Sequence, residues 1–284
     1  MDANELKACA REAGADLVGI APATRFDELP REKHPRTIFP ECESVIVLGR
    51  RVTRGTLRGV EEGTNFGCFY RYGQKWLSDR FLAMTAFTVA TALEDDGWES
   101  VPLPPLPAEV PAMGVPVREG AVAPNVLIDM NDAAVRAGLG EWGRCGTVLT
   151  PEYGPRQRFN AVLVDAAFEP TPLFEGAICL QEECEAVCPN GALGAVERRT
   201  VCGRDYPVAT IDQAMCASCR NGAAPNPYYP GAHADRLAAL CVRTCVDNLE
   251  RSERLTRPFK NTFRKRPAWA REPASDNAFS ITGR

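Results

Sequence analysis

The chain has 284 residues, which is enough for one large domain or two smaller ones. Hydrophobic residues make up 45% of it and the formal net charge is −4, so a sizeable core can form. No apolar run reaches the roughly 18 residues of a membrane-spanning helix, and residues 1–5 lack the basic start of a signal peptide. We therefore expect a cytoplasmic protein without a membrane span, in which thiols stay reduced and gathered cysteines indicate metal sites.

Apolar spacing before residue 172 predicts a mixture of helices and strands. Residues 6–13 have the pattern of a short amphipathic helix, and Gly14 is placed to end it. Helical patterns continue further along the chain, at 76–93 and 131–138. Short apolar runs predict buried strands, at 16–20, 44–48 and 160–165. The fold class we expect is α+β, with a boundary near Pro170-Thr-Pro172.

Two stretches between these elements lack a regular pattern. Residues 50–75 mix glycine, charge and aromatic side chains, which is typical of a functional loop or a lid. Residues 101–116 contain six prolines, and repeated proline is excluded from helix interiors and central strands. We therefore expect an extended arm there.

Eight of the twelve cysteines lie between residues 179 and 245, in sequence that we expect to form loops. Cys184-Glu-Ala-Val-Cys188-Pro189 matches the end of a bacterial ferredoxin motif, whose last cysteine precedes proline and binds the other cluster. Cys216-Ala-Ser-Cys219 and Cys241-Val-Arg-Thr-Cys245 provide a second half. Eight thiolates are enough for two 4Fe–4S clusters.

The ferredoxin crossover gives a working assignment of these cysteines. One cluster takes four of them, Cys188, Cys216, Cys219 and Cys241. The other takes the remaining four, Cys179, Cys184, Cys245 and Cys202. The first motif departs from the regular spacing, because Cys179 stands five residues before Cys184 and one cysteine is missing. Structural zinc and disulfides are the alternatives, although only one Cys-x2-Cys pair is present.

The C-terminal segment is strongly basic. Residues 251–271 carry eight basic side chains and a single acid, Glu253. Such a segment can bind RNA or an acidic electron donor. The alternative is a strap that neutralises the acidic body of the same chain.

Two segments, the first of them rich in glycine, carry a resemblance to a known family. They read Ala137-Gly-Leu-Gly-Glu-Trp-Gly-Arg144 and Leu149-Thr-Pro-Glu-Tyr-Gly-Pro-Arg156, and the cysteine stretch follows them. Together they resemble the cobalamin-dependent reductive dehalogenases and the related epoxyqueuosine reductases, over roughly residues 5–250. The helical-repeat extension and the Asp-(Ser/Thr)-x-Pro segment of many epoxyqueuosine reductases have no clear match here.

The resemblance implies a nitroreductase-like core followed by a two-cluster ferredoxin-like module. The corresponding division is 1–172 for a corrinoid-binding domain, 173–250 for the iron–sulfur domain and 251–284 for the basic tail. The core would hold base-off cobalamin, which needs no histidine ligand. Glycines let backbone approach a large planar ligand, and the alternative is that they only form turns. The corrinoid-binding residues that we expect are Gly138, Leu139, Gly140, Gly143, Thr150, Pro151 and Gly154.

Reduction at a corrinoid usually needs a proton as well as electrons. The candidate acids are Tyr70, Tyr72, Asp129 and Tyr153, and Arg144 is a cation that stabilises a phenolate. Each tyrosine also has an ordinary packing role as its alternative.

These observations favour a cobalamin-dependent iron–sulfur reductase that acts on a small organic molecule. Its partner would be a ferredoxin- or flavodoxin-type electron donor. One alternative is an electron-transfer protein that reduces a corrinoid on a partner. The other is a tRNA-modifying, epoxyqueuosine reductase-like enzyme, for which the basic tail would bind RNA.

Overall fold

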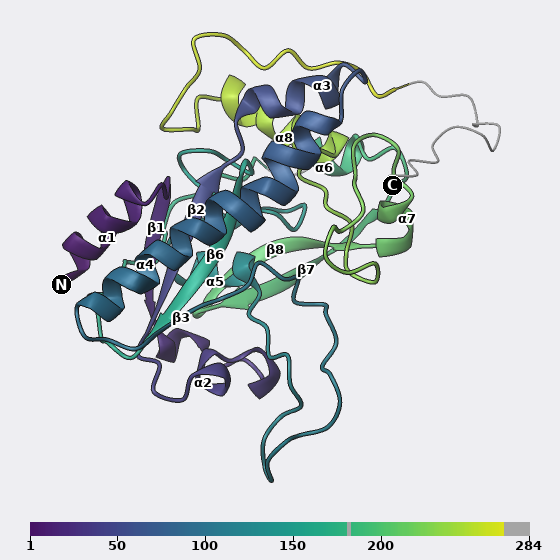
Figure 1. The fold of residues 1–284 in the computed structure, drawn as a ribbon. Coiled ribbons are helices and arrows are strands. Elements are labelled where there is room, and N and C mark those ends of the chain that lie inside the picture. Colours follow the sequence, from purple (N-terminus) through teal and green to yellow (C-terminus); the bar gives the residue numbers. More distant parts are fainter. Residues whose placement is uncertain (181–182, 270–284) are drawn as a thin grey trace.

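The computed structural model describes residues 1–180 and 183–269. A four-stranded antiparallel sheet forms its centre, and the three predicted strands all lie in it with longer bounds (Figure 1). A fourth strand was not predicted, because it has only three residues and ends in proline. It lies at an edge, where a missing backbone N–H is tolerated. In spatial order the strands are β1 (Leu17–Pro22), β2 (Ser44–Arg51), β6 (Gln157–Val164) and β3 (Ser100–Pro102).

Both faces of this sheet are covered. Ile46 and Leu48 of β2 point to one face, against α1 (Ala3–Glu12) and α4 (Ala83–Asp95). Val45 and Val47 point to the other, against α5 (Met130–Arg136) and the segment after β1. Side chains alternate along a strand, so burial on two faces explains why β2 is a continuous apolar run. The resulting fold is a mixed one, with helices on both sides of an open sheet.

The helix predicted over 76–93 begins earlier than its apolar pattern. Two π-helical segments, Phe69–Lys75 and Leu77–Leu82, lead directly into α4. Residues 50–75, expected as a loop or lid, therefore contain helical turns. The remaining short elements of the first 172 residues are Ala23–Phe26, Arg31–Lys33 and Arg54–Leu57 (3-10 helices), α2 (Pro35–Ile38), α3 (Arg58–Glu61), β4 (Glu141–Trp142) and β5 (Val148–Leu149).

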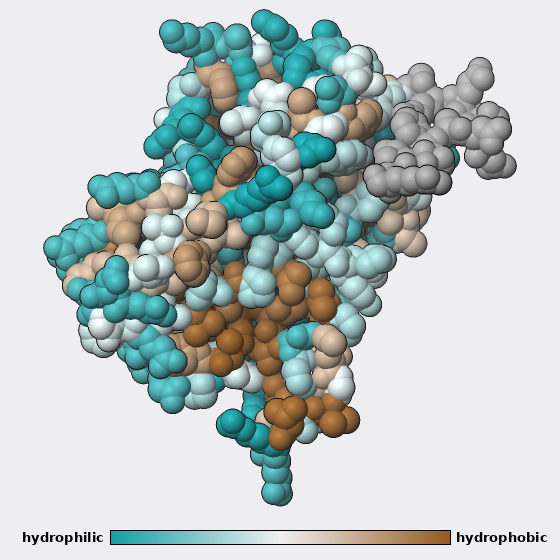
Figure 2. Space-filling view, in the orientation of Figure 1, coloured by the Kyte–Doolittle hydropathy of each residue, from teal (hydrophilic) through white to brown (hydrophobic). Residues whose placement is uncertain are grey.

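Residues 103–128 form the extended arm that the prolines predict. Figure 1 shows this segment as a long excursion from the body, between β3 and α5. Apolar side chains gather on the same part of the surface (Figure 2). Met113, Val115 and Val117 of the arm are among the most exposed hydrophobic residues.

The cysteine stretch has more regular structure than its sequence suggests. It contains α6 (Glu183–Ala186), β7 (Leu193–Val201), β8 (Arg204–Ile211), α7 (Gln213–Ala217) and α8 (Leu240–Arg251). Cys184 and Cys216 lie on helices, and Cys241 and Cys245 share one face of α8, so the expectation of loops was wrong for these four. Helix α8 was not predicted, because its apolar residues are interspersed with Cys241 and Cys245 and such cysteines favour the interpretation of a metal-binding loop.

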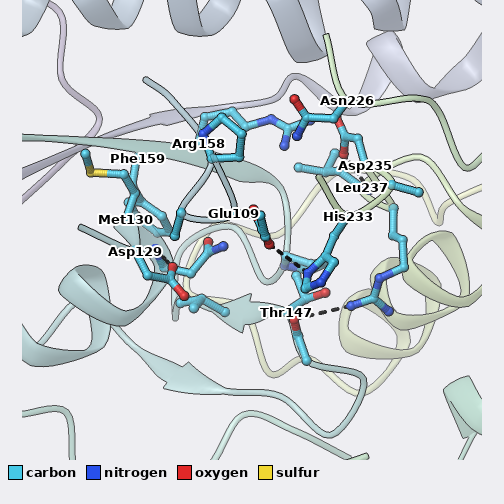
Figure 3. Close-up of a pocket in the computed structure, with 18 of the residues that line it drawn as sticks. Glu109, Asp129, Met130, Thr147, Arg158, Phe159, Asn226, His233, Asp235 and Leu237 are labelled. Carbon is cyan, nitrogen blue, oxygen red and sulfur yellow. Dashed lines mark hydrogen bonds and ion pairs between the residues drawn. The ribbon is translucent and has the colours of Figure 1, made fainter. Parts of the chain in front are cut away.

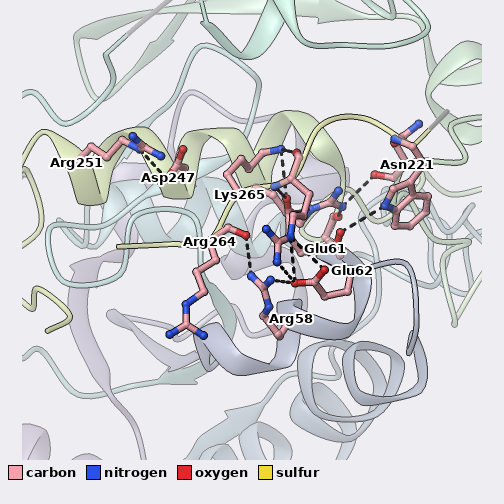
Figure 4. A network of polar contacts seen from close by, with 12 residues as sticks. Arg58, Glu61, Glu62, Asn221, Asp247, Arg251, Arg264 and Lys265 are labelled. Atoms are coloured by element: carbon pink, nitrogen blue, oxygen red, sulfur yellow. Dashed lines mark hydrogen bonds and ion pairs between the residues drawn. The ribbon is translucent and has the colours of Figure 1, made fainter. Parts of the chain in front are cut away.

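The basic tail crosses α3 and α8 as far as residue 269 (Figure 4). Lys265 lies 3.4 Å from Glu61, and Arg266 pairs with Glu62 at 3.0 Å. Arg251 pairs with Asp247 at 2.9 Å. These are the contacts expected of a strap that neutralises the chain's own acids. Arg271 lies outside the described residues.

Among the helices described, none is both long enough and apolar enough to cross a membrane.

Candidate metal centre and adjoining cavity

Four buried or half-buried cysteines gather beside α8, and we call them the first cysteine set. The thiols of Cys145 and Cys184 are joined by a hydrogen bond. Cys179 and Cys245 pack against the same apolar residues, Leu149 among them. Cys245 also interacts electrostatically with Cys145 and Cys179. The set therefore combines three cysteines of the 179–245 stretch with one from outside it.

The second cysteine set lies next to the first and contains Cys188, Cys216, Cys219 and Cys241. Cys216 interacts electrostatically with Cys219 and Cys188, and Cys241 interacts with Cys145 of the first set and with Cys188 and Cys216. Asn190 ties the two loops together, because its side-chain amide donates to the Met215 carbonyl at 2.8 Å. This grouping coincides with the four cysteines that the ferredoxin crossover assigns to one cluster.

The protein environment disfavours charge on most of these thiols. Burial raises the pKa of Cys241 to about 12 and raises the pKa of Cys245. The hydrogen bond that Cys184 donates to Cys145, together with burial, raises the pKa of Cys184. The same hydrogen bond lowers the pKa of Cys145 to about 6. A bound metal takes the place of the protons on such thiols.

Cys202 lies elsewhere, in the turn between β7 and β8, where its φ is 49°. Its sulfur lies 3.6 Å from the Arg25 carbonyl and 3.8 Å from Nη1 of Arg136. Arg136 is buried and pairs with Asp132 and, at 2.9 Å, with Glu28. The neighbours of Cys202 thus belong to the first 172 residues of the chain.

The donors of the two sets suit iron–sulfur clusters. Across 1–180 and 183–269, no three His, Cys, Asp or Glu side chains converge as the ligands of one metal ion. In a 4Fe–4S cluster each thiolate binds a different iron, so the four sulfurs surround a volume instead. Two backbone N–H groups donate to cysteine sulfur at 3.3 Å, from Arg144 to Cys179 and from Ala192 to Cys188. Such bonds stabilise the thiolates of these clusters.

A cavity of about 620 Å³ adjoins the first cysteine set (Figure 3). Its volume is within the range of small-molecule binding sites. Its wall is largely polar and internally paired. His233 lies 2.7 Å from Glu109 of the arm, and Asp235 accepts from Arg158 and, at 2.9 Å, from Gln74. These pairs fix the loop 226–237 against β6 and the arm.

Two buried donors in the cavity wall lack a partner among the described residues. They are Nε1 of Trp142, on β4, and Nη1 of Arg236. Arg236 also donates through Nη2 to the Cys145 carbonyl at 2.8 Å. Gly146 and Thr147, which follow Cys145, line the cavity as well. Unpaired buried donors are rare in proteins, and each needs an acceptor from a water, an ion or a ligand.

Asp129 is the predicted catalytic residue that lines this cavity. It caps α5, accepting from the backbone of Asn131 at 2.9 Å and of Asp132 at 3.2 Å. Burial raises its pKa, and the negative charge of Asp132 adds to the effect. Arg199 lies 3.7 Å away and opposes the shift. An acid with a raised pKa keeps its proton to higher pH, which suits a proton donor.

The other four predicted catalytic residues lie outside the cavity wall as described. Tyr72 is 49% exposed and makes an edge-to-face contact with Trp76. Tyr70 packs near Phe66 and Phe69, and burial raises its pKa. Tyr153 is 3% exposed, with the cations of Arg51 and Arg257 over its ring at 5.9 and 5.5 Å. Arg144 pairs with Glu185 beside the cysteines.

Sequence reasoning missed Tyr228 in the cavity wall. Its hydroxyl donates to Asp79 at 2.6 Å, and burial followed by this bond raises its pKa. The available signal was the long interval between Cys219 and Cys241, which contains three prolines, two tyrosines and one histidine although a compact cluster motif needs none of them.

None of the predicted corrinoid-binding residues is among the described residues that line the cavity. A Cβ on Gly140 would meet the Leu149 carbonyl at 1.9 Å, and one on Gly138 would meet the Pro172 carbonyl at 2.0 Å. Gly143 and Gly154 face leucine side chains, and Leu139 and Thr150 are buried. Pro151 binds the tail, because its carbonyl accepts from the Thr256 backbone at 2.9 Å. These residues therefore shape the β4–β5 hairpin that carries Trp142 and Cys145.

Comparisons with known proteins find two curated relatives, and both are reductases by name. The tetrachloroethene reductive dehalogenase of Sulfurospirillum multivorans is 28% identical over 229 residues, which cover 67% of this chain and 40% of that protein. The epoxyqueuosine reductase of Bacillus cereus is 24% identical over 227 residues, covering 68% of this chain and 53% of that protein. The chain thus spans about half the length of these curated relatives or less. No protein-family model matches it.

The solved structures include one reductive dehalogenase described as suggesting a mechanism for B12-dependent dehalogenation. It matches with a TM-score of 0.55 at 16% identity, over 94% of this chain and 41% of that one. That likeness concerns the fold alone. The two sequence relatives confirm the resemblance predicted from residues 137–144 and 149–156. The chain is related, at low identity, to reductive dehalogenases and epoxyqueuosine reductases.

Proposed function

We propose that the chain is a cobalamin-dependent iron–sulfur reductase that acts on a small organic substrate. The observation that carries this proposal is the hairpin β4–β5, which reaches two sites at once. Its turn contributes Cys145 to the first cysteine set, and the adjoining Trp142 and Thr147 line the cavity. An electron carrier held by the cysteines would then be close to a ligand in the cavity.

The cysteines divide into two ligand groups in this proposal. Cys188, Cys216, Cys219 and Cys241 would hold one 4Fe–4S cluster. Cys179, Cys184 and Cys245 would supply three ligands of the other. The core 1–172 would then be nitroreductase-like and the segment 173–250 ferredoxin-like. When bound, the clusters supply one-electron transfer and the corrinoid supplies a strongly reducing cobalt.

The cavity residues have separate tasks. The unpaired N–H groups of Trp142 and Arg236 would donate to the amide or phosphate oxygens of a corrinoid side chain. Asp129 would hold the proton for the substrate, and Arg199 would stabilise the carboxylate that remains. The arm, pinned by the Glu109–His233 pair, would shield that proton from bulk water.

The substitution Trp142→Phe tests this assignment, because it removes one N–H and keeps a ring at the same place. We expect cobalamin affinity to fall by roughly tenfold and the ligand-free protein to become more stable by about 1 kcal/mol, since an unpaired buried donor is lost. Trp98→Phe is the matched control, because Trp98 is 41% exposed and its N–H already pairs with Asp96.

The measurements are cobalamin uptake after anaerobic reconstitution, followed by its visible spectrum, and urea unfolding without ligand. A wild-type chain that takes up iron and no cobalamin would reject the corrinoid part of the proposal. Equal cobalamin affinity of the wild type and Trp142→Phe would show that cobalamin does not bind in this cavity.

A tRNA-modifying reductase is the second candidate, favoured by the Bacillus cereus relative. It requires basic surface for phosphate. Arg251, Lys265 and Arg266 already pair with acids of the chain itself. Binding to a tRNA stem loop, measured from 50 to 200 mM salt, tests it: affinity that falls steeply with salt supports an RNA substrate, and no binding at 50 mM rejects it.

A further inference from the structure

We propose that Cys145, and not Cys202, provides the fourth thiolate of the cluster held by the first cysteine set. The inference rests on the proposed presence of clusters. It concerns a cysteine outside the 179–245 stretch, on a different hairpin from the one that carries Cys202.

The position of Cys145 is fixed by its backbone. It is 2% exposed and sits in the β4–β5 turn, closed by bonds from Gly146 to Gly143 at 2.9 Å and from Gly143 to Thr147 at 2.8 Å. Arg236 holds its carbonyl. Its side chain packs in one apolar cluster with Cys184 and Cys241. The preceding residue, Arg144, donates its N–H to the sulfur of Cys179. The turn thus touches two members of the first set directly.

Cys202 is held away from this set by contacts of its own. Its sulfur rests against the Arg25 carbonyl and Arg136, and Arg136 is anchored by a buried pair with Asp132. To reach the first set, the β7–β8 turn would have to leave these partners. Cys202 lies inside the cysteine stretch, but the fold brings Cys145 to the first cysteine set instead.

The chemistry needs only what the cluster already brings. The thiol of Cys145 releases one proton and its sulfur forms one bond to iron, with no change in oxidation state. A cluster bound by Cys145 would also lie one residue from Gly146 and Thr147 of the cavity wall. Electrons would then cross a single turn of backbone to reach a ligand in the cavity.

The test compares Cys145→Ser with Cys202→Ser in the full chain, reconstituted anaerobically with iron and sulfide. We expect about eight irons per chain in the wild type and in Cys202→Ser. Cys145→Ser should lose between one and four of them, and in the oxidised state it should show the electron paramagnetic resonance signal of a 3Fe–4S cluster if only one iron leaves. Full iron content in Cys145→Ser, or a loss confined to Cys202→Ser, would overturn the inference.

A second variant keeps the test valid if Cys145→Ser fails to fold. Cys145→Asp retains an anionic ligand, so we expect iron to stay and the g values of the reduced cluster to move. A purely structural cysteine would leave those g values unchanged, and that result would also overturn the inference. A wild-type chain that binds no iron would overturn the proposed function itself, and this inference with it.

Discussion

The two hairpins of the molecule treat their cysteines in opposite ways. The β4–β5 turn packs Cys145 among other cysteines, whereas the β7–β8 turn packs Cys202 against Arg25 and Arg136 of the first 172 residues. In the sequence Cys202 lies inside the cysteine stretch and Cys145 lies outside it. Membership of a cysteine-rich stretch therefore identifies the kind of site, and the packing of each turn decides which cysteines can reach it.

A pair of glycine substitutions, one in each hairpin, tests the separate roles of the two hairpins. Among the predicted changes, it has the largest expected effect on stability and iron content. In Gly140→Ala the new Cβ would lie 1.9 Å from the Leu149 carbonyl, so β4 and β5 cannot keep their pairing. We expect a loss of about 4 kcal/mol or more in the free energy of unfolding, and a loss of iron. Gly203→Ala is the matched control.

Gly203 has φ +77° in the β7–β8 turn, with open space around it, so alanine there meets only backbone strain of about 1 kcal/mol. Iron should be unaffected. Urea unfolding and an iron assay measure both variants. Equal losses of stability and iron in Gly140→Ala and Gly203→Ala would contradict the view that only the β4–β5 hairpin supports the metal site.

The buried arginine beside Cys202 provides the next test. Arg136 is 1% exposed and is the nearer of two arginines that pair with the buried Asp132, so Arg136→Met leaves that carboxylate with Arg199 alone, at 3.5 Å. We expect a loss of about 3–5 kcal/mol in unfolding free energy. The iron content of the folded fraction should stay at the wild-type value, because this network contacts Cys202 and no member of the first cysteine set. Iron lost in proportion to stability would place Cys202 and its neighbours in the metal site.

The cavity acid gives a smaller, pH-dependent effect. The pKa of Asp129 is raised above 3.8 by burial and by Asp132, so the folded protein holds this proton more tightly than the unfolded chain. The stability contributed by that proton is present below pH 3.8 and is lost as pH rises through the folded pKa. Asp129→Asn keeps the helix cap and cannot ionise.

The stability of the wild type relative to Asp129→Asn should therefore fall as the pH rises from about 4 and then level off. Urea unfolding at a series of pH values measures this difference. A constant difference between the two proteins across that range would show that the carboxyl group has an ordinary pKa.

Much of the fold could be predicted from local sequence, because its strands are short apolar runs with little ambiguity. The strands at 16–20, 44–48 and 160–165 are examples. β3 was not found, since three residues with a proline are stable only at the sheet edge. The helix α8 was hidden by its own cysteines.

The candidate site was harder to predict, because it depends on contacts between distant segments. The grouping of Cys188 with Cys216 and Cys241 follows from a known motif. Cys145 has no such motif, and the only signal for it was the missing regular cysteine combined with an unassigned one upstream. Trp142 and Arg236 became candidates only when burial showed that each has an N–H without a partner.

The iron and sulfide content of the full chain, purified and reconstituted without oxygen, tests the central claim most directly. Two clusters predict about eight irons and eight sulfides per chain, with electron paramagnetic resonance signals of reduced 4Fe–4S centres after addition of dithionite. Stoichiometric zinc without iron, or cysteines found in disulfides with no metal bound, would contradict the account.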